Sequence, residues 1–293
     1  MKLHAECIPC ILTVRYREVA KFKGDSPEAV KLMAEMARML ADSADKGELA
    51  TVAATRLFRF LKKQLGVEDL YVEEKKIADE KALKVAEELR SKVMEQRGID
   101  RFRLACYAAL VGNALDFGVA SYQVADPEKL LDEILSCKPA IDDVEEFYKL
   151  LRKGGNCLYL LDNAGEIAFD RLFIEVLRDE GVQVVALVKS RGGFQNDATK
   201  EDAERVKLDE VCKVVETGTD ASSLFIEELP SDVLREVENA DFMVAKGMAH
   251  FEHLPELQIG CPVIFMLKAK CRVIASLLGV PVGSYVVKLE KSA

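Results

Sequence analysis

Three features that would place this chain in particular classes of protein are missing from it. No hydrophobic run approaches the ~20 residues needed to span a bilayer, and residues 1–6 lack the apolar core of a signal peptide. Positive charge is not in excess either, because the formal net charge is −9, whereas nucleic acids and anionic membranes bind cationic surfaces. We therefore expect a cytoplasmic protein with no nucleic-acid or membrane partner.

Internal repeats and low-complexity linkers are also absent. What is present is a chain of 293 residues with 49% hydrophobic and 31% charged residues, the usual balance of a globular protein with a full core. This length corresponds to one large domain or two ordinary ones. The acidic net charge does not exclude an anionic small substrate, because a few lysines in one cleft can hold a phosphate.

The pattern of the chain changes near residue 154. Before it, apolar residues recur with helical spacing almost throughout, and Ser26-Pro27 has the form of an N-cap followed by a first-turn proline. Residues 102–117 are unusually apolar and are predicted to form a central buried helix. We expect residues 1–153 to form a helical region that caps the rest of the chain.

After Gly154-Gly155, short apolar runs alternate with segments of helical length. This alternation predicts parallel strands joined by right-handed crossovers, and hence a doubly wound α/β core over residues 154–293. The predicted strands are Cys157–Leu161, Val182–Val188, Val211–Val215, Phe242–Ala245, Val263–Leu267 and Tyr285–Leu289.

The first predicted strand ends in Asp162-Asn163, followed by Ala164-Gly165 and an amphipathic helix. Ligands of open parallel sheets bind at the carboxyl ends of the strands, and oxygen donors are the ligands that Mg²⁺ or Mn²⁺ prefers. Asp162 and Asn163 are therefore candidate ligands of a divalent cation. Alternatively, Asp162 is simply the N-cap of the helix, since Asx residues are common caps.

Asp197 follows the second predicted strand, after the glycine-bearing loop 190–194. If this strand neighbours the first, Asp197 faces Asp162 across one crevice, and two facing carboxylates need a cation or a proton between them. Asp197 is therefore the third candidate ligand. The alternative is again capping, with Asp197 starting the helix that carries Glu201 and Asp202.

Two lysines follow later strands. Lys246 and Gly247 come directly after one strand, where glycine permits close approach and lysine suits a phosphate oxygen, and Lys268 follows another. Four strand ends carrying Asp-Asn, Asp, Lys and Lys would form one polar rim for a metal and a phosphate. Each lysine could instead be an ordinary solvated surface residue.

Asn113 and Asp116 lie three residues apart in the most apolar predicted helix, on one face. A buried polar pair needs partners. The two residues could line the crevice from above, or they could belong to a structural hydrogen-bond network.

Cys7-Ile8-Pro9-Cys10 is a Cys-x-x-Cys without a second copy, at the start of a predicted helix. Together with the neighbouring His4 and the distant Cys271, Cys7 and Cys10 could form a structural metal site, which usually needs four ligands. Inert packing is a second interpretation. A redox role is a third, but it would need the motif to follow a strand of a βαβ unit.

Five motifs together resemble the DUF89 family, also called the damage-control phosphatase (ARMT1-like) family, over essentially the whole chain. Its prokaryotic branch carries the N-terminal Cys-x-x-Cys. The motifs are Glu6-Cys7-Ile8-Pro9-Cys10, Gly112-Asn113-Ala114-Leu115-Asp116, Asp162-Asn163-Ala164-Gly165-Glu166, Asn196-Asp197-Ala198-Thr199 and Lys246-Gly247.

The resemblance implies a helical N-terminal region on a Rossmann-like three-layer α/β/α core with a mainly parallel sheet. It implies a phosphatase that depends on Mn²⁺, Co²⁺, Ni²⁺ or Mg²⁺, held by Asp162, Asn163 and Asp197. The residues that it places around the substrate and its phosphate are Asn113, Asp116, Lys246 and Lys268, to which we add Glu166. The chain departs from the family at His250, where members often have Asn, so His250 is a further candidate substrate contact.

We therefore expect hydrolysis of small phosphomonoesters, such as sugar phosphates or damaged phosphometabolites, with Asp162, Asn163, Asp197 and Lys246 as the catalytic set. One alternative is an S-adenosylmethionine-dependent carboxyl methyltransferase, although the first strand lacks the Gly-x-Gly-x-Gly turn that would admit the cofactor. Another is a non-catalytic protein that binds a metal or a sugar phosphate.

Overall fold

The computed structural model describes residues 1–114, 129–151 and 154–291. Within these ranges, a seven-stranded sheet has the order β1-β7-β6-β5-β2-β3-β4, and every neighbouring pair is parallel except β6 and β7. The strands are β1 Ile141–Asp142, β2 Gly155–Leu160, β3 Val182–Val188, β4 Lys213–Glu216, β5 Phe242–Lys246, β6 Val263–Lys268 and β7 Tyr285–Glu290.

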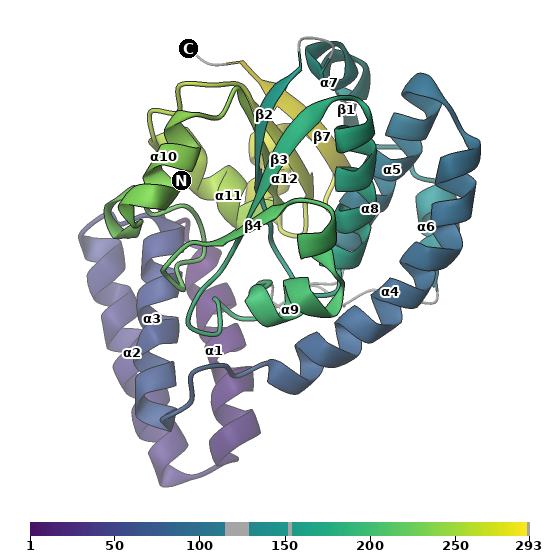
Figure 1. Cartoon of the computed structure of the whole chain (residues 1–293). Coiled ribbons are helices and arrows are strands. Elements are labelled where there is room, and N and C mark those ends of the chain that lie inside the picture. The colour runs from purple at the N-terminus through teal and green to yellow at the C-terminus, as the bar shows by residue number, and fades with distance from the viewer. Residues whose placement is uncertain (115–128, 152–153, 292–293) are drawn as a thin grey trace.

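Helices cover both faces of this sheet and extend beyond it (Figure 1). In chain order they are α1 Cys7–Lys23, α2 Pro27–Asp45, α3 Ala50–Leu65, α4 Val72–Glu95, α5 Gly98–Gly112, α6 Leu130–Leu135, α7 Val144–Leu151, α8 Ile167–Asp179, α9 Lys200–Arg205, α10 Ser231–Glu238, α11 Gly247–His253 and α12 Arg272–Leu278.

The sheet has a hydrophobic core on each face, because successive side chains of a strand point to opposite sides. On one face Tyr159 of β2 packs near Phe173 of α8, with ring centroids 6.4 Å apart. On the other face Leu158 and Leu160 belong to a core that includes Met248 of α11. These two cores confirm the predicted three-layer α/β/α arrangement.

The first three helices form a bundle at one side of the sheet, and α4 runs from this bundle towards α5 (Figure 1). The bundle has its own core around Met36, Leu57 and Phe58. As predicted, Ser26 caps α2, since its hydroxyl accepts a hydrogen bond from the Ala29 amide at 3.2 Å.

The observed strands β2–β7 match the predicted ones with differences of at most two residues, at the starts of β2 and β4. The sheet also draws β1 from the region before residue 154. The buried helix predicted for residues 102–117 is α5, which ends at Gly112, so Asn113 caps its end instead of lying within it. No helix of the described ranges is long and apolar enough to cross a membrane.

Candidate metal centre and adjoining cavity

The carboxyl ends of β2 and β3 lead into two polar loops that lie side by side. The two strands are parallel neighbours, which is the condition on which the prediction for Asp197 depended. The Ala198 amide donates a hydrogen bond to the Asp162 carbonyl at 2.7 Å, and Asn163 lies opposite Asp197 in an isolated antiparallel bridge. The structure therefore brings Asp162, Asn163 and Asp197 together.

Neither carboxylate caps the helix that follows it. Helix α8 begins after Glu166, which occupies its N-cap position. Helix α9 begins after Thr199, which forms a capping box with Asp202, and the Thr199 amide donates to Asp202 at 2.8 Å. The capping interpretation of Asp162 and Asp197 is therefore wrong.

Two buried amides hold the Asp162 carboxylate. Nδ2 of Asn113 and Nδ2 of Asn163 each donate to Asp162 Oδ2 at 2.9 Å. Both nitrogens also donate to Glu166 Oε2, at 2.9 Å from Asn113 and 3.2 Å from Asn163. An amide that donates through its nitrogen keeps its carbonyl oxygen for acceptor contacts.

The donor set fits a divalent cation. Two carboxylates and the Asn163 amide oxygen are hard oxygen ligands, and Mg²⁺ or Mn²⁺ would keep further positions for water or phosphate. Across the described ranges, no three His, Cys, Asp or Glu side chains gather into a group that could hold a metal ion. Cys7, Cys10 and Cys271 line one cavity, and their structural metal site stays a prediction. A centre at the strand ends depends on the amide of Asn163.

Lys246 is connected to this centre through Glu166, in a fully buried ion-pair network. Its Nζ atom is 2.8 Å from Glu166 Oε1 and 2.7 Å from Asp170 Oδ1, and Tyr159 donates to the same Asp170 oxygen at 2.5 Å. Burial alone would lower the pKa of Lys246, but the attraction of Asp170 and Glu166 outweighs it and raises the pKa. Lys246 therefore stays charged, and its predicted phosphate contact stays a prediction.

Lys189 is a further cation at the centre, and the sequence reasoning missed it. Its Nζ atom lies 3.8 Å from Asp197 Oδ2 and donates to the Ala221 carbonyl at 2.8 Å. Burial lowers the pKa of Lys189, although the charges of Asp197 and Asp162 oppose the shift. Lys189 directly follows β3, so the rule that selected Lys246 and Lys268 could have found it.

The remaining predicted residues have different surroundings. His250 is buried; its Nδ1 lies 2.9 Å from the Ser223 hydroxyl and its Nε2 3.4 Å from the Leu161 carbonyl, and burial lowers its pKa. Since a carbonyl only accepts, the proton belongs on Nε2.

Lys268 lies 3.3 Å from Glu133, and its amide donates to Asn113 Oδ1 at 3.1 Å. Asp116 lies outside the described residues.

Asp79 of α4 connects the helical region to the two loops. Its Oδ1 atom accepts a hydrogen bond from the Gly165 amide at 2.6 Å, and its Oδ2 pairs with Arg205. Arg205 also pairs with Asp202 at 2.8 Å. Asp202 belongs to the capping box of α9, the helix that follows Asp197. Burial and the nearby Asp202 charge raise the pKa of Asp79. One buried carboxylate thus links the segments that carry Asp162 and Asp197.

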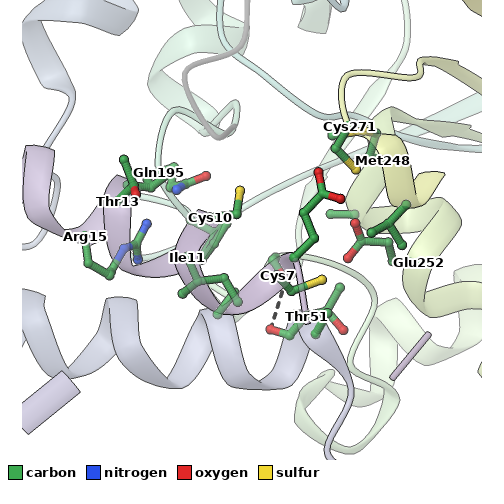
Figure 2. Close-up of a pocket in the computed structure, with 18 of the residues that line it drawn as sticks. Cys7, Cys10, Ile11, Thr13, Arg15, Thr51, Gln195, Met248, Glu252 and Cys271 are labelled. Carbon is green, nitrogen blue, oxygen red and sulfur yellow. Dashed lines mark hydrogen bonds between the residues drawn. The ribbon is translucent and has the colours of Figure 1, made fainter. Parts of the chain in front are cut away.

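A cavity of about 320 Å³ opens beside the centre. Asp162, Asn163 and Asp197 line it, together with residues of α1, α3 and the loop before Asp197. Arg15 and Gln195 lie towards one end, whereas Glu252 and Cys271 lie towards the other, with Cys10 and Ile11 of α1 between them (Figure 2). The candidate ligands therefore face a space bounded by the first helix of the chain.

Comparisons with known proteins agree with these features. A family model described as the damage-control phosphatase ARMT1-like domain matches residues 3–286. A damage-control phosphatase of Pyrococcus horikoshii is 32% identical over 291 residues, which cover 99% of each chain. One from Archaeoglobus fulgidus is 33% identical over 292 residues, again 99% of each. The crystal structure of a DUF89 family protein from Pyrococcus horikoshii has a TM-score of 0.88 and 32% identity, and the match covers 99% of this chain and 100% of that one.

Proposed function

Because this chain belongs to the damage-control phosphatase ARMT1-like family, we propose that it hydrolyses small phosphomonoesters with the help of a divalent cation. The observation that carries the proposal is the meeting of Asp162, Asn163 and Asp197 at the ends of β2 and β3, on the wall of a cavity. Relatives named damage-control phosphatases support a hydrolase acting on phosphate esters.

The three oxygen-bearing side chains would hold the cation, with Mn²⁺, Co²⁺, Ni²⁺ and Mg²⁺ as the candidates. When bound, such a cation polarises a phosphate oxygen and orients the attacking water. Asn113 and Asn163 would keep the Asp162 carboxylate aimed at it, because both amides bind the same oxygen of Asp162.

Two buried lysines lie close to carboxylates at or next to the candidate centre. Lys189 lies beside Asp197, and Lys246 balances Glu166 and Asp170. Phosphoryl transfer depends mainly on positioning and electrostatics. We propose that Lys189, close to the centre, offsets negative charge when a phosphate binds, and that Lys246 fixes the Glu166 carboxylate to which both amides donate.

A metal-dependent assay tests the proposal. The purified chain is treated with a chelator and assayed with 4-nitrophenyl phosphate and a panel of small phosphate esters, with each of the four cations added back. We expect activity that depends on the cation and disappears in Asp162→Ala, while Asp209→Ala, a change at an exposed position shortly before β4, leaves it intact.

Two outcomes would contradict the proposal. Full activity of Asp162→Ala would show that the centre is elsewhere. Binding of S-adenosylmethionine by calorimetry, without any phosphate release, would favour the methyltransferase alternative.

A further inference from the structure

The cavity beside the candidate centre gives information about the substrate, and the inference rests on the proposed function. A phosphate at Asp162, Asn163 and Asp197 directs the alcohol part of its ester into this cavity, because the same three residues line it. Its volume of about 320 Å³ lies near the lower end of the ~300–1,000 Å³ common for ligand pockets. The described walls therefore favour a small alcohol part.

The walls of the cavity are mainly apolar. The contributing side chains come from the first helix, the third helix, the loop before Asp197 and helix α11; they include Ile11, Val14, Ala54, Phe194 and Met248. Apolar walls favour apolar ligand groups, because burying apolar surface contributes roughly 25 cal/mol per Å².

The hydroxyl groups in the walls already bind the protein. Thr13 donates to the Pro9 carbonyl at 2.7 Å, and Ser222 donates to the Thr51 carbonyl at 3.3 Å. The Thr51 hydroxyl lies 2.8 Å from His253 Nδ1. The hydroxyl hydrogens of Thr13 and Ser222 are therefore engaged within the protein. A ligand rich in hydroxyl groups would find acceptors but few free donors among these wall hydroxyls, so part of the cost of removing its water would not be recovered.

The charges around the cavity disfavour a second anion. Glu6 and Glu252 line it, and among the described lining residues Arg15 is the one Lys or Arg. The Arg15 guanidinium is buried and bound to Glu18, with Nη2 2.9 Å from Oε1 and Nε 2.9 Å from Oε2. It also stacks over the Phe58 ring at 4.8 Å. The charge of Arg15 is therefore paired with Glu18 within the wall, although the buried Nη1 atom has no hydrogen-bond partner.

From these observations we propose that the substrate is a monophosphate ester whose alcohol part is small, mainly apolar and without a second anionic group. A carboxylate or second phosphate in the cavity would meet Glu252, and also Glu6, which pairs with Arg272 at 3.2 Å. The one Lys or Arg among the described lining residues is already paired with Glu18. Like charges in a partly buried space repel.

The test compares three esters of similar size on the cation-loaded enzyme: n-butyl phosphate, glycerol 3-phosphate and 3-phosphonooxypropanoate. Burial raises the pKa of Glu252 to about 7, so the assay is run well above that pH. We expect kcat/KM to fall in that order, by about tenfold or more between the first and the last. Equal or faster hydrolysis of either polar ester than of the butyl ester would overturn the inference.

Two variants test whether the charges of the cavity walls disfavour a second anionic group on the substrate. Ile11→Lys places a cation in the wall, and Glu252→Gln removes a carboxylate; both should narrow the gap between the carboxylate ester and the butyl ester. Ile77→Lys is the matched control, because Ile77 is 52% exposed on α4 and outside the lining, and it should leave the ratio unchanged. An unchanged ratio in both wall variants would contradict the electrostatic argument.

If none of the esters is hydrolysed with any cation, the proposed function fails. The inference is then decided by calorimetry with the corresponding alkyl phosphonates, for which we expect the same order of affinity. A phosphonate with a carboxylate that binds as tightly as the butyl analogue would overturn it.

Discussion

Gly247 lies directly against Asp162: a Cβ atom added to Gly247 would stand 1.8 Å from Asp162 Oδ2. Gly247 also has φ +79°, a conformation that favours glycine. This glycine begins α11 directly after Lys246, so the Lys-Gly pair serves the centre through close packing against its first ligand.

Gly247→Ala should therefore displace the Asp162 carboxylate and reduce metal-dependent turnover by about a hundredfold, in line with the effect of small misplacements in catalytic sites. Gly279→Ala is the control, because Gly279 has φ +68° but no atom within 4 Å of its added Cβ. Both variants carry similar backbone strain, and only the first should lose activity. Equal activity in the two would show that the contact with Asp162 is unimportant.

Lys246→Met should destabilise the fold. The change leaves Glu166 and Asp170 as buried carboxylates without their cation, and breaking a buried pair in this way costs about 3–5 kcal/mol. Urea unfolding measures the difference, with Lys200→Met as the reference because Lys200 is exposed and lies 3.9 Å from Glu204. A loss no larger than that of Lys200→Met would mean that the buried network is not formed.

Asp79→Ala should weaken the apparent affinity for Mn²⁺. The variant leaves the Gly165 amide and Arg205 without their shared acceptor, and a lost buried hydrogen bond to a charged group costs about 1.5–3 kcal/mol. Asp79→Asn keeps an oxygen for Gly165 and should lose less affinity. The cation concentration that gives half-maximal activity is the measurement, and identical values in wild type and both variants would rule out a positioning role.

The thiols at the cavity should react slowly. None of the eight cysteines is part of a disulfide, and burial raises the pKa of Cys7 and raises that of Cys271 to about 11. Since the thiolate is the reactive form, alkylation of Cys271 by iodoacetamide should be slow at neutral pH and accelerate towards pH 11, as followed by mass spectrometry. Rapid alkylation of Cys7 or Cys271 at neutral pH would instead support a redox role.

Much of this arrangement could be predicted because parallel strands place their carboxyl ends at one edge. The strand ends before Asp162, Asp197 and Lys246 are local features of the sequence, and the observed strands agree with them. The pairing of Arg15 with Glu18 is also local, at a spacing of three residues in α1. The burial of this pair at the cavity wall, however, depends on packing between distant segments.

Long-range packing decided what the sequence could not show. The contact between Asp79 and Gly165 and the placement of α1 beside the centre join residues far apart in the chain. The end of α5 at Gly112 was not predicted either. The sequence likewise left open whether Asp162 caps the following helix, and the structure places Glu166 at the N-cap position of α8.

The central claim is that Asp162, Asn163 and Asp197 bind one divalent cation. Its most direct test is a crystal grown with Mn²⁺, in which anomalous scattering locates the ion. We predict a single strong peak in contact with oxygen atoms of all three side chains. A peak elsewhere, with these three side chains making no contact to it, would contradict the account.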